Sequence, residues 1–458
     1  NEYRQENKNS SHIADFSMAL SDFLSSKNTT KSHFFSNSNI KLNNNFFDEN
    51  NIEINLQNVT NDEYLKVYKI DGDQINFNNI NTLHSYLSLD AKKNDIEFYT
   101  SLEVYEDLTK DKQSRHEFIY PNYAIQKRFL SKKSNDYVLK SYGSQRKYNT
   151  NTYEGIIVND LEFNTFSKFS NKGLVTNYKM LFKNTNIDSK NSKNHKDKFE
   201  QNLASVIQYN MELPLKKESP EFLNNFTPKV SIMYSPNKSK NLSSDNRRMN
   251  TSNIYSLNRI ANNETVEGGA SLTYGTIFNK INKETNQDTL NFEVASILRI
   301  KENLDLPTSS TIGKKMSNIF GNIEFYPNKN LSLKYDFSID NNFDKTNYDS
   351  ISTKFKMNKF VTSFEYTDDK NNLINESFTS NSSSFEIDKN NSIDFNVRRN
   401  NEKSATEFYN LIYNYKNDCL VASIKFNKEF YKDSDLKPEK EIFFTLSLIP
   451  FGGVTTGN

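Results

Sequence analysis

Residues 411–426 have the sequence Leu-Ile-Tyr-Asn-Tyr-Lys-Asn-Asp-Cys-Leu-Val-Ala-Ser-Ile-Lys-Phe, which is two short runs around the turn Asn417-Asp418. In both runs apolar side chains occupy every second position: Leu411, Tyr413, Tyr415, Leu420, Ala422, Ile424 and Phe426. After a charged stretch at 431–440, a third run places Phe444, Leu446 and Leu448 on one face. A period of two, with one apolar and one polar face, predicts strands of a transmembrane β-barrel.

Connections upstream of this region alternate between short and long. We expect short turns at 388–391, at Asn358 and at 327–330, and longer loops at 399–407, 368–375, 341–349 and 301–318. Transmembrane barrels have short periplasmic turns and longer external loops, so this alternation supports the same fold. If a strand and its connection take about twenty residues, a chain of this length should contain on the order of 22 strands.

The two faces stay distinct over several predicted strands. Leu331, Leu333 and Tyr335 lie opposite Ser332, Lys334 and Asp336, and Ile393 and Phe395 lie opposite Asp394 and Arg398. The same parity places Ser423 and Lys425 on the polar side, which we expect to face the lumen. Alternation is weaker in the N-terminal half, for example at 33–40, 52–56, 65–68 and 96–102.

The composition favours a wide barrel over several compact domains. A chain of 458 residues could form three domains, but 35% hydrophobic residues and a mean hydropathy of −0.80 supply little material for three cores. Barrel strands need an apolar residue only at every second position, and 35 Phe and 25 Tyr can form aromatic girdles without Trp. A net charge of +1 gives no argument for nucleic-acid binding. The start at Asn1, without Met or a signal region, indicates a piece of a longer protein.

No catalytic or metal-binding motif stands out. Five histidines are scattered without metal-ligand spacing, Gly268-Gly269 is too isolated for a phosphate loop, and there is no Gly-x-Ser-x-Gly motif. The lysine-rich run 190–198 predicts a solvated loop, with phosphate contact as the alternative. We therefore expect a protein that is not an enzyme and has no catalytic residues, cofactor or metal site.

Several segments resemble the LptD family, the outer-membrane barrels of lipopolysaccharide export. The more specific are 417–438 and 254–269, the latter containing Tyr255, the triplet Asn258-Arg259-Ile260, and Gly268. The family usually has Asp where this chain has Asn258. Weaker similarity occurs at 115–123, 213–215 and 223–234.

The resemblance implies an all-β fold, a large antiparallel transmembrane barrel of about 26 strands. Residues 1–458 would then be a partial barrel domain that lacks the opening strands and the periplasmic jelly-roll domain. The implied function is insertion of lipopolysaccharide into the outer leaflet of a Gram-negative outer membrane, through the lumen and a lateral seam. Implied partners are lipopolysaccharide, outer-membrane lipids, an LptE-type plug lipoprotein and, through the absent domain, a periplasmic lipopolysaccharide bridge protein.

The resemblance also suggests roles for individual residues. Lys334, Asp336, Asp394 and Arg398 would face the plug or water. Cys419, placed by parity with Ser423 and Lys425, would form a disulfide with the N-terminal periplasmic domain. The C-terminal side of the seam would be the last strand, marked by Phe444, Leu446, Leu448 and Pro450, and Pro450 would limit pairing there or simply end the strand.

Two other functions remain open. A porin or import barrel would pass small solutes through its lumen and keep its seam shut. A non-membrane, Asn-rich β-protein acting as a binding surface would have strands that are polar on both faces and loops of even length, which the C-terminal half does not show.

Overall fold

The computed structural model describes residues 2–21, 29–42, 46–67, 81–130, 135–370, 375–429, 440–448 and 452–457, so Pro450 lies outside the described residues. The described part contains 26 strands, the four-residue helix α1 (Tyr64–Val67) and the 3-10 turn η1 (Thr308–Ser310). The strands belong to one antiparallel sheet, which confirms the predicted all-β class. Among the described residues, no helix is long and apolar enough to cross a membrane.

Chain contacts divide the protein into two compact units. The first comprises Asn1–Phe166, Lys179–Ser205 and Asn263–Thr265, and the second comprises Ser167–Tyr178, Val206–Asn262 and Val266–Asn458. Strands of the first unit are β1 (Glu2–Asn7), β2 (Ser10–Ser21), β3 (Thr29–Ile40), β4 (Glu49–Val59), β5 (Thr82–Lys93), β6 (Ile96–Asp107), β7 (His116–Leu130), β8 (Asp136–Tyr148), β9 (Tyr153–Asn164), β11 (Val175–Lys190) from Lys179 onward, and β12 (Glu200–Glu212) up to Ser205.

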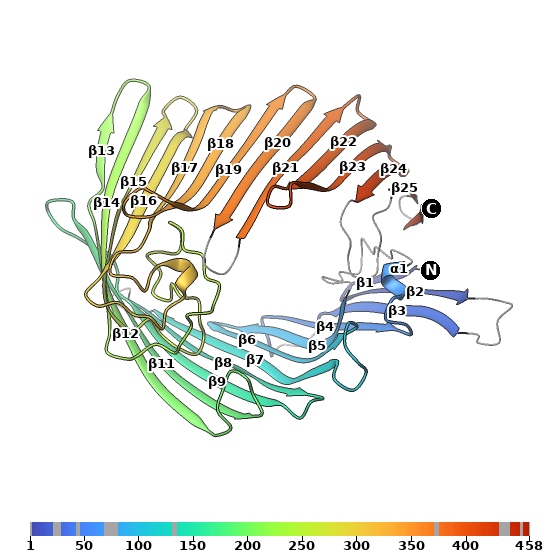
Figure 1. The fold of residues 1–458 in the computed structure, drawn as a ribbon, viewed down its shortest axis with the longest axis horizontal. Helices are drawn as coiled ribbons and strands as arrows, with labels where there is room; N and C mark the ends of the chain where they lie inside the picture. Colours follow the sequence, from blue (N-terminus) through green and yellow to red (C-terminus); the bar gives the residue numbers. More distant parts are fainter. Residues whose placement is uncertain are drawn as a thin grey trace. The chain divides into compact units, whose positions relative to one another are not determined.

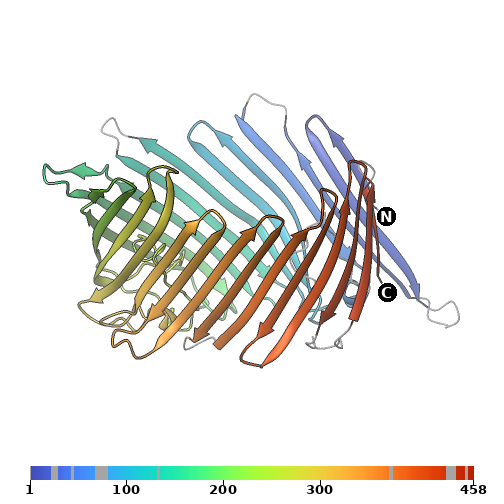
Figure 2. The same cartoon turned by 90° about the horizontal axis from the view of Figure 1, so that it is seen from above.

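The remaining strands belong to the second unit, where from β14 to β26 each strand pairs with the next in the chain, coloured green to red in Figures 1 and 2. They are β10 (Lys168–Phe169), β13 (Leu215–Glu218), β14 (Phe222–Ser235), β15 (Gly269–Asn282), β16 (Gln287–Arg299), β17 (Ile319–Asn328), β18 (Leu331–Ile339), β19 (Thr346–Met357), β20 (Phe360–Lys370), β21 (Asn375–Glu386), β22 (Asn391–Asn400), β23 (Ala405–Lys416), β24 (Leu420–Glu429), β25 (Lys440–Leu448) and β26 (Gly452–Gly457).

A small apolar cluster marks one face of the first unit. Tyr64 and Leu65 of α1 pack with Phe35 of β3 and Leu83 of β5, and all four are almost fully buried. Residues 65–67, where the sequence alternates only weakly, therefore form the end of α1 and not a strand. A short apolar run does not distinguish a strand from a helical turn that packs onto a sheet.

The second unit has two chemically different faces, and the strand register defines them. Cross-strand neighbours share a face, so the pairs Leu333–Thr353, Thr353–Phe364 and Leu411–Phe426 belong to one side. This side, which we name the apolar face, exposes large hydrophobic side chains: Ile232, Tyr274, Phe325, Ile351, Phe364, Phe395, Leu411, Ile424 and Phe444. The opposite side, which we name the polar face, contains Lys334, Ser352, Ser380 and their neighbours.

Most predicted connections of the C-terminal half are confirmed. Asn358, with φ of 50°, lies in a two-residue turn between β19 and β20, and residues 300–318 form a long connection between β16 and β17. The 399–407 connection is shorter than expected, because β22 and β23 leave only residues 401–404. The described strands outnumber the estimate of about 22, partly because β10 and β13 have only two and four residues, too few for an alternating pattern.

The C-terminal end requires a correction. Phe444, Leu446 and Leu448 belong to β25, which is not the last strand, because β26 pairs with it from Phe443–Gly457 to Leu448–Gly452. β26 has the sequence Gly-Gly-Val-Thr-Thr-Gly. Three glycines leave too few side chains for a period of two to be recognised, so the sequence pattern missed this strand.

Candidate functional site: a loop cluster on the polar face

Two long connections of the second unit pack onto the polar face of their own strands. They are the β14–β15 connection at 236–268, outside 263–265, and the β16–β17 connection at 300–318 (Figure 1). The buried apolar side chains of the two loops are Leu242, Met249, Ile254, Ile260, Leu306 and Ile312. With Ala295, Ile297 and Phe320 of the strands beneath, they form one buried core, which we name the loop cluster. Burial of these side chains holds both loops against the sheet.

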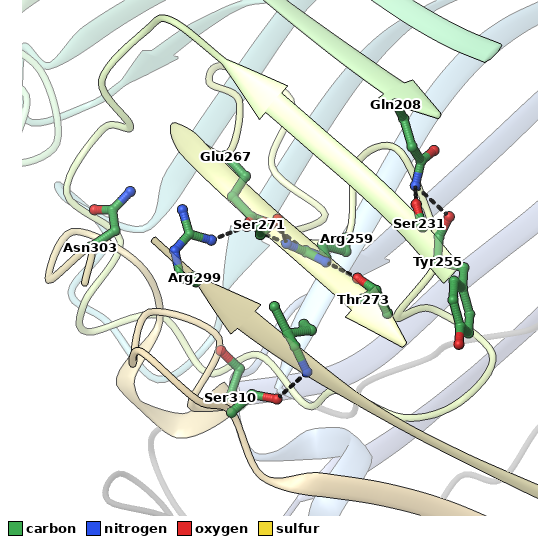
Figure 3. Close-up of polar contacts among 12 residues, drawn as sticks. Gln208, Ser231, Tyr255, Arg259, Glu267, Ser271, Thr273, Arg299, Asn303 and Ser310 are labelled. Carbon is green, nitrogen blue, oxygen red and sulfur yellow. Dashed lines mark hydrogen bonds and ion pairs between the residues drawn. The ribbon is translucent and has the colours of Figure 1, made fainter. Parts of the chain in front are cut away.

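A buried ion network joins strands β15 and β16 to the 236–268 loop. Glu267 lies between Arg259 and Arg299, and all three side chains are at most 2% exposed. The Nε and Nη2 atoms of Arg259 donate to the Glu267 carboxylate at 2.5 and 2.6 Å, and Arg299 Nη1 donates to the same carboxylate (Figure 3). Arg259 also donates to Thr273 Oγ1 at 2.8 Å and Ser271 Oγ at 2.6 Å on β15. The guanidinium of Arg259 therefore fastens the loop to the sheet.

The network keeps Glu267 ionised. Burial alone would raise the pKa of this carboxyl, but the charges and hydrogen bonds of Arg259 and Arg299 outweigh burial and hold the pKa below its usual value. Two guanidinium groups share one carboxylate, so removal of that carboxylate would leave two buried cations without a counter-charge.

Gly268 is required by its surroundings. Its backbone N–H donates to Ser239 Oγ at 2.9 Å, and its carbonyl accepts from Arg299 Nη2 and from Asn303 Nδ2, the latter at 3.3 Å. A Cβ atom at this position would lie 2.3 Å from the Asn237 carbonyl oxygen. No side chain fits without moving backbone.

The other residues of the 254–269 motif also shape the loop. The Tyr255 carbonyl accepts from Gln208 Nε2 at 3.1 Å, while burial, reinforced by the charge of Glu293, raises the pKa of the Tyr255 hydroxyl. Asn258 Nδ2 donates to the Asn262 carbonyl at 3.0 Å, and Ile260 is in the loop cluster. The structure thus brings Tyr255, Asn258, Arg259, Ile260 and Gly268 together in one packed loop.

The first unit holds the segment 263–265 by a second buried ion pair. Lys183 Nζ contacts both Asp160 carboxylate oxygens at 2.8 Å and also donates to the Asn263 carbonyl at 3.0 Å. Thr185 Oγ1 donates to the Glu264 carbonyl at 3.0 Å. No sequence pattern predicted these contacts, because the carbonyl partners of Lys183 and Thr185 are about 80 positions away in the chain and nothing in the local pattern of β11 marks the pairing.

The six predicted lumen residues lie on the polar face but do not form one site. Lys334 Nζ contacts Glu324 at 2.7 Å, and Asp336 accepts from Asn322 at 2.8 Å. Asp394 accepts from Asn414 at 2.6 Å, and Arg398 pairs with Glu407 at 2.9 Å with its guanidinium 4.3 Å from the Phe378 ring centre. Ser423 lies opposite Asn414, and Lys425 lies above the Phe443 ring at 5.9 Å. This arrangement lines a surface instead of assembling a catalytic centre.

Cys419 lies in the turn before β24 and not within the strand. Its thiol is free and exposed, and its backbone N–H donates to Asn417 Oδ1 at 2.9 Å. Strand parity, which placed it with Ser423 and Lys425, applies only to extended residues and so does not fix its direction. Phe444 and Leu446 lie on the apolar face, because they pair with Ile424 and Ala422.

The comparison with protein families agrees with this geometry. The family model described as "LptD: LPS transport system D" matches residues 29–404. The chain belongs to the LptD family. It is therefore a Gram-negative outer-membrane protein of lipopolysaccharide transport, with the large antiparallel β-barrel fold of that class.

Comparison with solved structures gives only distant likenesses. One engineered variant of the Rh. blastica porin is 9% identical, covers 66% of this chain and 92% of its own, and has a TM-score of 0.25. A triple variant of the Rhodopseudomonas blastica porin is 6% identical and has the same TM-score of 0.25. That match covers 58% of this chain and 87% of the porin chain. Likenesses at this level support no argument about function. A search of curated proteins finds no match.

Proposed function

We propose that the chain guides lipopolysaccharide into the outer leaflet without covalent chemistry. In this proposal the saccharide moves along the polar face, while the acyl chains leave sideways between strands. The single observation that carries it is the two-faced sheet of the second unit in an LptD family member: exposed Phe, Ile and Leu on one side, and serine, lysine and asparagine on the other. An amphiphile needs both environments at once.

Sideways exit needs a weak seam. An unpaired backbone group in hydrocarbon costs several kcal/mol, so a long regular ladder resists opening. We assign the C-terminal side of the seam to β26, in place of Phe444, Leu446 and Leu448 of β25. β26 has only six residues, three of them glycine, and glycine weakens a strand interior because it has no side chain to pack.

The proposal also includes partners. An LptE-type plug lipoprotein or water would cover Lys334, Asp336, Asp394 and Arg398, and a periplasmic bridge protein would deliver lipopolysaccharide through an N-terminal domain. Cys419 would be disulfide-bonded to that domain, because its thiol is exposed in a short turn. Non-reducing electrophoresis of the full-length protein tests the bond: Cys419→Ser should change the mobility, and unchanged mobility would reject it.

Site-specific cross-linking tests the export route. A photo-reactive amino acid replaces either Val454 of β26, which pairs with Leu446 of β25, or Phe364 of β20 on the apolar face. During lipopolysaccharide export in cells, we expect lipopolysaccharide adducts at position 454 and few at 364. Equal adducts at both positions would reject the seam. Passage of small solutes with no adduct at either position would favour the porin alternative.

A further inference from the structure

A cavity on the polar face of the second unit is not filled by the loop cluster. Its volume is about 530 Å3, within the range of small-molecule sites. It lies over β18 to β23, and its walls include Ser352, Ser380, Ser382, Asn396, Lys354 and Phe408. Ser352 and Ser380 are half-buried, so their hydroxyls are held within the walls, whereas Ser382 is exposed at the rim.

The walls offer unused hydrogen-bonding groups. Within the described part of the chain, the hydroxyls of Ser352, Ser380 and Ser382 make no hydrogen bond to protein. Asn396 donates its amide N–H to Asn410 Oδ1 at 2.9 Å, which leaves its own amide oxygen available as an acceptor. Hydroxyls both donate and accept, so this wall suits a ligand that is itself rich in hydroxyl groups.

The charges around the cavity balance. Lys334 is paired with Glu324 and Arg398 with Glu407, while Lys354 and Glu365 are both exposed and have opposite charge. A phosphate entering here would meet the Glu365 carboxylate and cations that are already neutralised. Phe408 adds an apolar surface on which the C–H groups of a sugar ring can pack. These features favour an uncharged saccharide over an anion.

We propose that this cavity is a subsite for uncharged sugar residues of the lipopolysaccharide in transit. The proposal rests on the proposed function and adds which chemical part of the substrate binds here. Hydroxyl groups of the sugar would replace water on Ser352, Ser380, Ser382 and Asn396, and the bound sugar would be exchanged easily because no buried charge holds it.

Because the sequence has no Trp, one substitution creates a unique fluorophore. Phe408→Trp reports from the cavity, and Phe395→Trp, on the apolar face and outside the cavity lining, is the matched control. With the full chain folded in detergent micelles, maltohexaose should change the emission of F408W saturably and leave F395W unchanged. Glucose 6-phosphate should bind more weakly than glucose itself.

Two leucine pairs in β21 then test the wall. S380L/S382L blocks the cavity, whereas T379L/S383L changes the apolar face of the same strand. We expect the first pair to weaken maltohexaose binding about tenfold or more, and the second to leave it unchanged. Equilibrium dialysis with labelled maltohexaose repeats the comparison in the tryptophan-free chain.

The subsite would be overturned if the S380L/S382L and T379L/S383L variants bound maltohexaose equally well, or if no saturable maltohexaose binding occurred. Loss of a co-purifying plug lipoprotein in S380L/S382L, with sugar binding intact, would also overturn it and assign the cavity to that protein. Absence of lipopolysaccharide adducts at position 454 would count against the export route only, because sugar binding is measured without transport.

Discussion

Two parts of the same sheet face differ in chemistry. Over β15 to β17 the polar face presents Ala295, Ile297 and Phe320, which the apolar side chains of the two packed loops cover. Over β18 to β22 the corresponding positions are Lys334, Ser352 and Ser380, which surround a cavity. Strand parity is the same in both parts, so the difference comes from what covers the strands. Positions of the polar face are therefore apolar where the loop core packs on them, and polar where water or a buried hydrogen-bond partner meets them, as Arg259 does at Ser271 and Thr273.

The largest expected effect follows removal of the shared carboxylate in the covered part. Glu267→Ala leaves Arg259 and Arg299 buried without a counter-charge and should destabilise the folded protein by about 3–5 kcal/mol. Thermal unfolding in detergent micelles measures it. Glu324→Ala, which breaks only the partly exposed pair with Lys334, is the control and should cost about 0–1 kcal/mol. Similar losses for both variants would contradict the distinction between the two parts.

Truncation of the core beneath the loops comes next. Ile297 is fully buried in the loop cluster, so Ile297→Ala should cost about 2–5 kcal/mol, from lost burial and the cavity that remains. Limited proteolysis should cut the 236–268 loop faster in this variant. Ile232→Ala on the apolar face, which is 46% exposed, should not change that cleavage rate. Protection that survives Ile297→Ala would show that the apolar core does not hold the loop.

A single added methyl group tests the tight approach of the loop. Gly268→Ala places a Cβ against the Asn237 carbonyl and should cost about 1–3 kcal/mol, because backbone must shift. The measurement is the midpoint of unfolding in micelles. Full stability of this variant would mean that the loop can shift freely, which would weaken the contrast between a fixed covered part and an open one.

Acid should loosen the covered part by a smaller amount. The folded-state pKa of Glu267 is lowered, so its stabilisation is fully present above the ordinary carboxyl pKa of about 4.3 and is lost as the pH falls through the lower folded value. Proteolysis of the 236–268 loop by an acid-active protease should therefore accelerate below about pH 4. In Glu267→Gln that acceleration should be reduced, and an identical pH profile in both proteins would exclude Glu267 as the cause.

The sequence predicted the strands of the C-terminal half well and the loop cluster poorly. A bilayer on one side and water on the other impose a period of two, so β17 to β25 and most of their turns were recognisable. Loops have no such period. The contact between Arg299 and Glu267 joins residues 32 positions apart, and nothing local to either residue predicts it. The family-like motif identified Arg259 and Gly268 but not their partners, and β26 was missed because glycine carries no pattern.

Cys419 is the only sulfhydryl in the sequence, and the turn that carries it leaves it open to reagents. After reduction of any disulfide at Cys419, a bulky maleimide that cannot cross lipid would therefore attach at this position from one compartment only. The side from which intact cells or sealed vesicles admit that label gives the orientation of the turns that follow β15, β17, β19 and β21, since these turns share one edge of the sheet with the turn of Cys419. One residue thus suffices to orient the whole second unit in its membrane.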